Sequence, residues 1–388
     1  MLPKRLKQLR LARGWSLDEL SESLGGLVTK QALSKYEKGL SVPSLKVLAK
    51  MAEVFGVKTA RLFTEPIVQV ELLAYRKCAA MPKRDEHMVE GLVTQALEER
   101  IALQEKIGDA APLNLPGKKF RVASLDDAER AAVKLREFWN LGTSTISSVT
   151  ELLEDQFIHV FAVATSSDKF DGTSAVAKDE KGNVIAAAVV SREGVAGERQ
   201  RLTLMHEVGH LLLGVAEGVD EEKASHRFAG AFLAPASLLK REVGSKRTTI
   251  QLRELFLLKR RFGMSAQALA YRLHDLGIIN DSSYRWLCIQ FNHNRMRKNE
   301  PEPLPREEAQ WLKRTTLRAL SEGLISSTEA ERMTGEPHTV EHQELIDRRA
   351  FMRLPAAERK KVLQEQAERL KEHYAEIKGL GGGDFVDY

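Results

Sequence analysis

The sequence predicts a multidomain protein that is mainly α-helical and contains one α+β region. Three observations predict this class: a length of 388 residues, helical spacing of apolar residues over most of the chain, and two apolar runs near its middle. A chain of this length exceeds what one ordinary core serves, so two or three domains are expected. The expected parts are an all-helical domain at 1–65, a strand and helix connector at 66–125 with a linker near 108–117, an α/β domain at 126–280, and a helical region at 300–388.

Composition excludes several classes of protein. The chain is 43% hydrophobic and 29% charged, as in soluble globular proteins. No apolar run reaches the roughly 18 residues of a membrane helix, and the basic N-terminus lacks the apolar core of a signal peptide. Cys78 and Cys288 are the two cysteines, too few for a disulfide framework or a thiolate zinc site. We therefore expect a cytoplasmic protein with no membrane partner.

Residues 1–65 concentrate the positive charge. They hold twelve Lys and Arg against six Asp and Glu, a net charge of +6, which leaves the remaining chain about neutral. Helix-capping residues predict four short helices here: Ser16 with Glu19 forms a capping box, and Thr29 and Ser44 precede two further helices. A basic helical domain favours a polyanionic partner, and a merely solvated basic surface is the alternative.

The apolar runs FIHVFAVA (157–164) and NVIAAAVV (183–190) predict strands of a small sheet. Turn-forming residues separate the two runs. The other expected segments are helices at 126–153 and from about 199 to 277, and a second linker at 299–307.

The segment MHEVGHLLLG (205–214) has the spacing of a metal site. His206 and His210 lie four positions apart, so a helix places both imidazoles on one face, within reach of one ion. Glu207 is one step round the helix and is placed to polarise a bound water rather than to bind the ion. A surface helix with two ordinary histidines is the alternative, but two buried, unpaired imidazoles in so apolar a helix would be destabilising.

A catalytic zinc site needs a third protein ligand. The predicted helix DEEKASHRFAGAFLAP (220–235) offers Glu222, which is favoured over Glu221 because Glu221 turns about 100° away, toward Phe228. His226 shares the face of Glu222. It is a candidate partner for a ligand, a candidate donor to the transition state, or an alternative third ligand. Acids that merely favour the helix dipole are the plainer interpretation of this N-terminus.

A rival motif, HTVEH (338–342), has the inverted H-x-x-E-H spacing of another class of zinc peptidase. It lies in a polar stretch with little apolar packing, and only 46 residues follow it. We interpret it as a coincidence.

The stretch RQRLTLMHEVGHLLL (199–213), followed by EKASHRFAGAFLAP (222–235), resembles the ImmA/IrrE family of metallopeptidases. The segments LLEDQFIHVFAV (152–163) and KFDGTSA (169–175) also match that family's layout, so the resemblance covers about residues 70–280. It implies a zincin-like α/β peptidase domain with one zinc ion per chain. It also implies His206, His210 and Glu222 as metal ligands and Glu207 as general base. The family's ligand helix often reads E-x-x-A-N-x-F-A, whereas Ser225 and His226 stand here at the Ala-Asn pair.

Residues 1–65 resemble the Xre/Cro/C1-type helix-turn-helix, through WSLDELSESLGG (15–26) and KQALSKYEKGLSVPSLKVLAKMAEVFGV (30–57). The resemblance implies a third helix in the major groove of double-stranded DNA, bound as a homodimer by analogy. Gln31 is suited to adenine, and Lys30 to guanine or a phosphate. A module that binds protein instead is the alternative. The positions that match the groove-facing residues are Thr29, Lys30, Gln31, Ser34 and Lys35.

These patterns together predict a DNA-binding regulator with zinc-dependent endopeptidase activity, whose substrate is a specific repressor or antitoxin-type protein. The strand at 184–190 is expected to be a sheet edge that pairs with an extended peptide. The alternative is a transcriptional regulator or antitoxin whose zinc domain senses or binds a partner without proteolysis. The helical tail at 347–374 is expected to be a dimerising helix.

Overall fold

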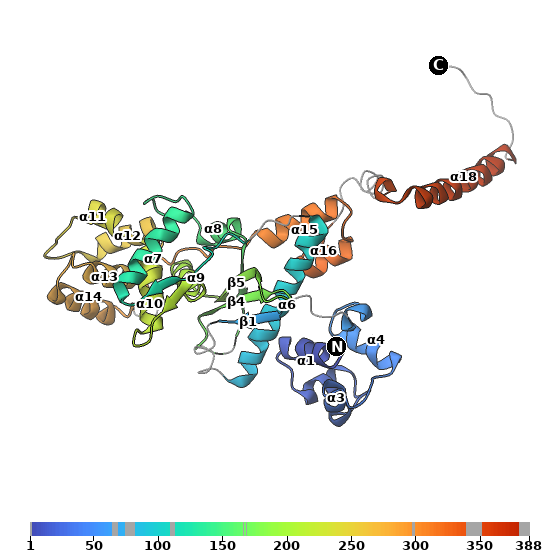
Figure 1. Ribbon diagram of the computed structural model, residues 1–388, viewed down its shortest axis with the longest axis horizontal. Coiled ribbons are helices and arrows are strands. Elements are labelled where there is room, and N and C mark those ends of the chain that lie inside the picture. The colour runs from blue at the N-terminus through green and yellow to red at the C-terminus, as the bar shows by residue number, and fades with distance from the viewer. Residues whose placement is uncertain are drawn as a thin grey trace, which may run out of the picture. The chain divides into compact units, whose positions relative to one another are not determined.

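The computed structural model describes residues 2–63, 69–73, 82–108, 113–165, 167, 169–296, 299–338 and 351–379 (Figure 1). The chain forms two compact units, Met1–Ala102 with Ala110–Gln310, and Leu103–Asp109 with Trp311–Tyr388. The predicted fold class is confirmed: the N-terminal region is all helical, a mixed sheet with helices occupies the centre, and the C-terminal region is helical.

The N-terminal helices form around one small core, made chiefly by Leu6, Leu9, Leu20, Leu33 and Phe55. The predicted capping signals act as expected, because the capping box of Ser16 and Glu19 is formed and Thr29 and Ser44 cap the helices that follow them. The elements are α1 (Leu2–Ala12), α2 (Leu17–Ser23), α3 (Lys30–Glu37), α4 (Leu45–Val54) and the 3-10 helix η1 (Thr59–Leu62).

A four-stranded sheet has the order β1-β4-β5-β3. Its strands are β1 (Gln69–Leu72), β3 (Ile158–Val163), β4 (Gly172–Lys178) and β5 (Val184–Arg192). The two predicted strands are present, and β4 is an additional strand between them in the chain. The expectation that residues 184–190 form a sheet edge is wrong, because β5 pairs with β3 on one side and β4 on the other.

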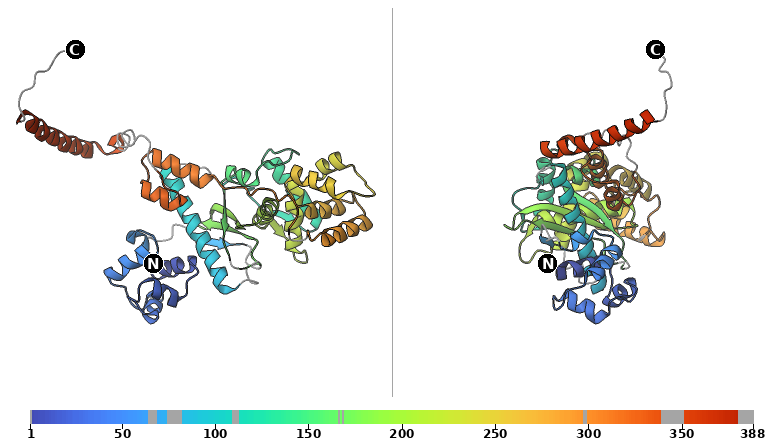
Figure 2. Two further views of the ribbon diagram at one scale, coloured as in Figure 1. Left: turned by 180° about the vertical axis from the view of Figure 1, so that it is seen from behind. Right: turned by 90° about the vertical axis from the view of Figure 1, so that its right-hand side faces the viewer.

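Helices cover both faces of this sheet (Figures 1 and 2). On one face, Val89, Val93 and Leu97 of α6 (Lys83–Ile107) pack on alternate residues of β4 and β5, including Ala175 and Ala188. On the other face lies α9 (Gly197–Leu212), with α10 (Glu221–Leu233) packed against it. A strand buried on both faces needs small or apolar residues at every position, which explains the run of alanines and valines in β5.

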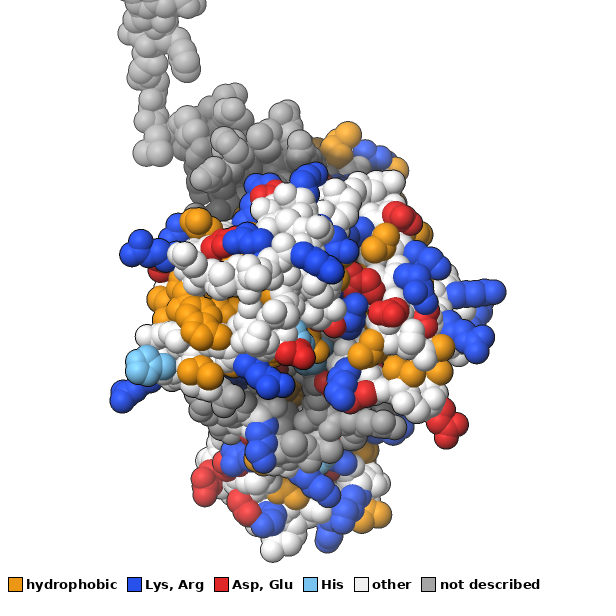
Figure 3. Space-filling view, turned by 90° about the vertical axis from the view of Figure 1, so that its left-hand side faces the viewer, with side chains coloured by type: hydrophobic (Ala, Val, Ile, Leu, Met, Phe, Trp, Pro, Cys, Tyr) orange, Lys and Arg blue, Asp and Glu red, His pale blue; other side chains and the backbone are white. Residues whose placement is uncertain are grey.

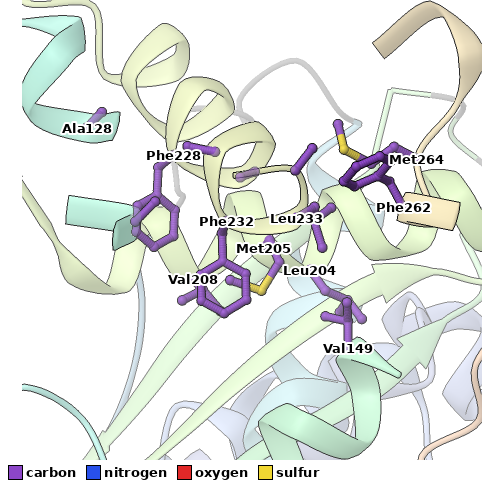
Figure 4. Close-up of a cluster of buried hydrophobic side chains, with 14 of the residues drawn as sticks. Ala128, Val149, Leu204, Met205, Val208, Phe228, Phe232, Leu233, Phe262 and Met264 are labelled. Atoms are coloured by element: carbon purple, nitrogen blue, oxygen red, sulfur yellow. The ribbon is translucent and has the colours of Figure 1, made fainter. Parts of the chain in front are cut away.

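The main core lies between α9, α10 and the helices beyond them. Figure 4 shows Met205 and Val208 of α9 beside Phe232 of α10, with Phe228 on the next turn; all four side chains are fully buried. The aromatic rings of Phe228 and Phe232 lie 6.3 Å apart. These apolar contacts fix how α9 and α10 cross, because large side chains leave few ways to pack without voids.

The remaining elements of this unit surround that core. A short sheet joins β2 (Phe120–Val122) to β6 (Leu213–Val215) in parallel, directly after the end of α9. Figure 3 shows the side on which α11 to α14 lie, where apolar side chains gather between basic and acidic ones. The helices are α7 (Leu125–Phe138), α8 (Val149–Asp155), α11 (Ala236–Val243), α12 (Leu252–Phe262), α13 (Ala266–Asp275) and α14 (Asp281–His293).

The predicted linker at 299–307 is bound along its length to the folded unit that precedes it. Glu307 accepts hydrogen bonds from the backbone of Thr150, at 2.8 Å, and from Arg201, while its own backbone pairs with the side chain of Gln200. Glu300 binds the buried amino group of Lys259 at 3.1 Å. Buried ion pairs and backbone hydrogen bonds therefore hold this extended segment on the N-terminal end of α9.

The second unit is small and helical. Its core includes Leu103, Ala319, Leu320, Ile325 and Ala330. Besides the last residues of α6, from Leu103 on, its helices are α15 (Trp311–Ser321), α16 (Ser327–Thr334) and α18 (Ala356–Gly379). Among the described residues of the whole chain, no helix is both long enough and apolar enough to cross a membrane.

Candidate metal centre and nucleic-acid surface

Helix α9 carries the H-E-x-x-H motif and is buried along nearly all of its length. His206 is 2% exposed and His210 is 5% exposed. This burial disfavours the surface-helix alternative, because imidazoles removed from water need polar partners or an ion to offset the loss of solvation.

The glycine inside the motif sets how closely the second helix approaches. A Cβ atom at Gly209 would lie 3.2 Å from both Cα and Cβ of Ser225 in α10. Helices that cross at a glycine come nearer than larger side chains would permit. This close crossing brings the first turn of α10, which carries Glu222, beside the two histidines.

His206, His210 and Glu222 converge on one point. Their ligand atoms lie within 4.8 Å of one another. The Nε2 atoms of the two histidines are 3.0 Å apart, and each lies 3.4 Å from one carboxylate oxygen of Glu222. In the sequence, Glu222 is separated from His210 by a strand and a turn, and the α9–α10 crossing closes that gap.

These separations fit a tetrahedral zinc site. Ligand atoms bound at about 2.0–2.1 Å to a tetrahedral ion lie about 3.3 Å from one another, close to the 3.0 Å between the imidazole nitrogens and to the 3.4 Å from each nitrogen to a different oxygen of the Glu222 carboxylate. Two neutral imidazoles and one carboxylate form a donor set that zinc commonly takes in hydrolytic enzymes. A tetrahedron with three protein ligands keeps its fourth position open for water or substrate.

Glu221 lies next to the ligands and contacts the other side of one of them. Its carboxylate is 3.2 Å from Nδ1 of His210, the nitrogen that does not face the cluster. Burial lowers the pKa of His210, but the carboxylates of Glu222, Glu207 and Glu221 outweigh this effect and raise the pKa above its ordinary value. A carboxylate on the outer nitrogen also orients an imidazole for metal binding, so Glu221 is a residue that the sequence argument set aside and the structure brings to the site.

Glu207 is fully buried between α9 and the start of β4. A Cβ atom at Gly172 would lie 3.3 Å from Cγ of Glu207, so a larger residue there would press on this side chain. Ser191 pairs with Gly172 across the sheet, and Ser174 lies on the same face two residues along β4. The hydroxyl groups of Ser174 and Ser191 are buried and make no hydrogen bond within the described residues. The residues of β4 and β5 next to Glu207 are thus small, and two of them carry hydroxyl groups.

His226 lies beside the cluster without joining the three ligand atoms. Its ring centroid is 4.2 Å from that of His206, at an interplanar angle of 52°. It is exposed, whereas His206 and His210 are buried. The ring is therefore placed to meet a molecule that approaches the metal ligands from solvent.

A cleft of about 730 Å³ opens at the ligand cluster. Its wall includes His210 and Glu222, the residues from Val215 to Glu221, and Leu73 from the end of β1. Leu73 is a residue that the sequence argument did not connect with the site. Only the pairing of β1 with β4 brings it there.

The five residues predicted to face DNA lie at the start of α3 or along it. Thr29, Lys30, Gln31 and Lys35 are exposed and Ser34 is half-buried. The hydroxyl of Thr29 caps the helix by accepting from the backbone N–H of Ala32 at 3.3 Å. Lys30 forms an ion pair with Asp18 of α2. Gln31 and Lys35 thus present their side chains outward, and the other three have structural contacts or partial burial.

Helix α3 is held in place by a buried ion pair. Both Nε and Nη2 of Arg10 donate to the carboxylate of Glu37, at 2.7 and 2.8 Å, and Nη1 donates to the backbone oxygen of Trp15. A two-pronged guanidinium–carboxylate pair fixes direction as well as distance. The outward face of α3 is therefore presented by a firmly placed helix.

The rival motif at 338–342 falls almost wholly outside the described residues. His338 is described, and its Nε2 lies 2.6 Å from the hydroxyl of Thr334 at the end of α16. The motif's other residues lie in the range 339–350, which the structure does not describe. Its interpretation as a coincidence stays a prediction.

Two family models match the chain. Residues 6–62 match a helix-turn-helix model and residues 163–274 match the IrrE N-terminal-like domain. The second match contains β4, β5, α9 and α10, and so every residue of the ligand cluster.

Curated relatives match the N-terminal region. The chain is 36% identical over 72 residues to the SPbeta prophage-derived uncharacterized HTH-type transcriptional regulator YonR of Bacillus subtilis, covering 19% of this chain and 65% of YonR. It is 39% identical over 66 residues to the HTH-type transcriptional regulator SinR of Bacillus licheniformis, covering 17% and 58%. It is 36% identical over 62 residues to the uncharacterized HTH-type transcriptional regulator YgzD of Bacillus subtilis, covering 16% and 91%. The chain thus spans less than two thirds of YonR and of SinR.

Proposed function

Because the chain belongs to the helix-turn-helix family of transcriptional regulators and carries an IrrE N-terminal-like domain, we propose that it is a DNA-binding regulator with zinc-dependent endopeptidase activity. Its substrate is a specific protein of the repressor or antitoxin type. The observation that carries the proposal is the convergence of His206, His210 and Glu222 on one point beside the buried carboxylate of Glu207.

The ligand cluster and its surroundings divide the work of peptide hydrolysis. His206, His210 and Glu222 would hold a zinc ion, which would supply Lewis-acid chemistry that makes water more acidic and a peptide carbonyl more electrophilic. Glu207 accepts a proton from the attacking water at its carboxylate. It then returns that proton to the nitrogen of the departing amine, so one side chain acts as base and then as acid.

The walls around Glu207 support this role. Burial between α9 and β4 keeps bulk water from the carboxylate. His226, exposed beside His206, is placed to donate a hydrogen bond to the carbonyl oxygen of a bound peptide as that oxygen gains charge.

Cleavage is tested with a peptide library prepared from a bacterial proteome, with products identified by mass spectrometry. The zinc-loaded wild-type protein is compared with Glu207→Gln, whose zinc content is measured in parallel. We expect cleavage by the wild type only, with equal zinc in both proteins. Equal cleavage by the variant would remove Glu207 from the mechanism. No cleavage by a zinc-loaded wild type would favour the regulator whose zinc domain binds a partner without proteolysis.

The helix-turn-helix domain is proposed to bind double-stranded DNA through α3, as a homodimer on a palindromic site. Residues 1–65 carry a net charge of +6, which supports attraction to phosphates. Gln31 and Lys35 are the predicted contact residues whose side chains face outward. Selection of duplexes from a random pool identifies the site, and failure to enrich any sequence would favour the protein-binding alternative.

A further inference from the structure

Strand β4 is the strand of the sheet that lies beside the catalytic carboxylate. Its first residue, Gly172, meets Glu207, and its third, Ser174, lies on the same face. The inner side of β4 is paired with β5. A peptide that passes the metal cluster in extended form therefore has one edge for main-chain pairing next to Glu207, the outer edge of β4.

That edge is already occupied by β1. Gln69 to Leu72 pair antiparallel with Lys178 to Ala175. The backbone N–H of Leu73 donates to the backbone oxygen of Ser174 at 2.9 Å, which extends the pairing one residue nearer to Gly172. Leu73 then forms part of the wall of the cleft together with His210.

The contacts of β1 are those of a bound peptide rather than of a central strand. It has four residues, and within the described part of the chain it pairs on one side only, with β4. Val70 and Leu72 are only partly buried against the core that α6 forms with the sheet. An ion pair between Glu71 and Lys178 is exposed, with relative side-chain exposures of 53% and 35%. Short edge strands with exposed ion pairs contribute little stability, so another strand can compete with β1.

We propose that the outer edge of β4 is a strand-addition site for an extended peptide, and that β1 is its internal occupant, which the peptide must displace. This inference rests on the proposed peptidase function for its biological meaning. The peptide that fits has apolar side chains at alternate positions, as Val70 and Leu72 do, and an acidic side chain opposite Val176, diagonal to Lys178, as Glu71 has.

The location of β1 in the chain gives this displacement a regulatory meaning. The helix-turn-helix domain ends with η1 at Leu62, and β1 begins at Gln69. The strand that covers the peptide edge is therefore the first element after the DNA-binding domain. Removal of β1 from β4 by a peptide therefore changes the segment that connects the DNA-binding domain to the sheet.

The register supplies a direct test. Because Leu73 and Ser174 form a hydrogen-bonded pair, the next pair, Leu72 and Ala175, is a non-hydrogen-bonded pair. The Cα atoms of such pairs lie about 4.5 Å apart, within the range that a disulfide spans. The test protein carries Leu72→Cys and Ala175→Cys. In the background, Cys78→Ser and Cys288→Ser remove the natural thiols, and Glu207→Gln removes the proposed general base so that the peptide is not hydrolysed.

Fluorescence anisotropy measures the binding of a fluorescein-labelled peptide that has the sequence of residues 67–75. We expect the reduced protein to bind it, and the oxidised protein, in which β1 cannot leave the edge, to lose at least about tenfold in affinity, because binding requires the state in which the edge is uncovered. Reduction of the oxidised sample should restore binding. The protein with Ala175→Cys alone in the same background should bind equally in both redox states.

Three results would overturn the proposal. They are failure of the disulfide to form, equal or tighter peptide binding by the oxidised protein, and absence of peptide binding in both redox states. Tighter binding by the oxidised form would mean that β1 is itself the platform on which the peptide pairs. Because this assay measures binding in a variant without the catalytic carboxylate, its outcome is independent of whether the wild type hydrolyses peptides.

Discussion

The proposed DNA-binding surface and the metal centre are both built on helices, but in opposite ways. The outward residues of α3 are exposed, neighbours in sequence, and belong to one eight-residue helix. The proposed metal ligands are buried or half-buried and come from two helices, and their meeting depends on the crossing at Gly209 and Ser225. A surface that reads DNA must face solvent, whereas a catalytic centre must hold its groups away from solvent, and this requires tertiary contacts.

The largest expected effect is at the ligand cluster. His206→Ala and Glu222→Ala should each lower zinc affinity by more than about a hundredfold. Loss of a ligand's hydrogen-bond partner alone costs about 10–100-fold, and loss of the ligand itself should cost more. Zinc content is measured by mass spectrometry after dialysis without chelators. Lys223→Ala, an exposed change on α10, should keep about one zinc per chain. Full zinc content in Glu222→Ala would assign the third ligand elsewhere, with His226 the first residue to examine.

The second effect concerns the ion pairs that hold α10 to its neighbours. The carboxylate of Glu129 on α7 binds Arg272 of α13 in two-pronged fashion, at 2.6 and 2.6 Å, and Arg227 of α10 at 2.9 Å. Glu129→Gln should lower the free energy of unfolding by about 3 kcal/mol at pH 7, because two guanidinium groups lose their shared partner. Chemical denaturation measures this. Asp275 of α13 also pairs with Arg227, at 2.5 Å, and with Arg272, at 3.6 Å. A loss below the error of the measurement would show that Asp275 satisfies both arginines by itself.

The same residue predicts a dependence of stability on pH. Burial raises the pKa of Glu129, but the hydrogen bonds and charges of Arg272 and Arg227 outweigh it, so the pKa lies below the ordinary value of a glutamate. The stabilisation is therefore present above that value and is lost as pH falls through the lower pKa of the folded protein. The difference in unfolding free energy between wild type and Glu129→Gln should be constant near neutral pH and shrink in acid. A difference that grew in acid would contradict the direction of the shift.

The third effect tests the helix crossing without touching a ligand. Gly209→Val should lower the free energy of unfolding by about 1–3 kcal/mol and weaken zinc binding, because the added side chain meets Ser225. Gly230→Ala is the matched control on α10, since a Cβ atom there meets only Cδ of Arg272, at 3.6 Å. That change should be neutral or stabilise by about 0.5–1 kcal/mol through helix propensity. Normal zinc affinity in Gly209→Val would show that the crossing does not set the ligand geometry.

The smallest expected effects on stability are at the exposed helix, where the changes act on DNA binding instead. Gln31→Ala should cost about 1–3 kcal/mol of binding to the selected DNA and relax specificity at one base pair. Lys35→Ala should weaken binding to all sequences alike. It should also reduce the slope of log binding constant against log salt concentration by about one, as for the loss of one phosphate contact. Neither change should shift the melting temperature, since both side chains are exposed. A lowered melting temperature would assign these side chains to the fold rather than to DNA.

Local patterns predicted those elements whose signals lie within one turn or one strand. Ser16, Thr29 and Ser44 cap helices because a side-chain oxygen meets a backbone N–H only two or three residues away. The apolar runs at β3 and β5 are long enough to identify strands. Strand β4 escaped prediction because GTSAVAK has neither a long apolar run nor clear alternation, and its pairing comes from neighbours far along the chain.

The sequence by itself determined the chemistry of this protein: a pair of histidines four residues apart, a glutamate between them, an acidic helix start beyond, and a basic, capped helical region at the N-terminus. Tertiary structure decided which of these groups meet. It placed Glu221 on His210, made β5 an interior strand, put Leu73 in the wall of the cleft and fastened residues 300–307 to α12 and α9. The reason is physical: residue types fix which interactions are available, whereas packing between distant segments fixes the distances on which each interaction depends.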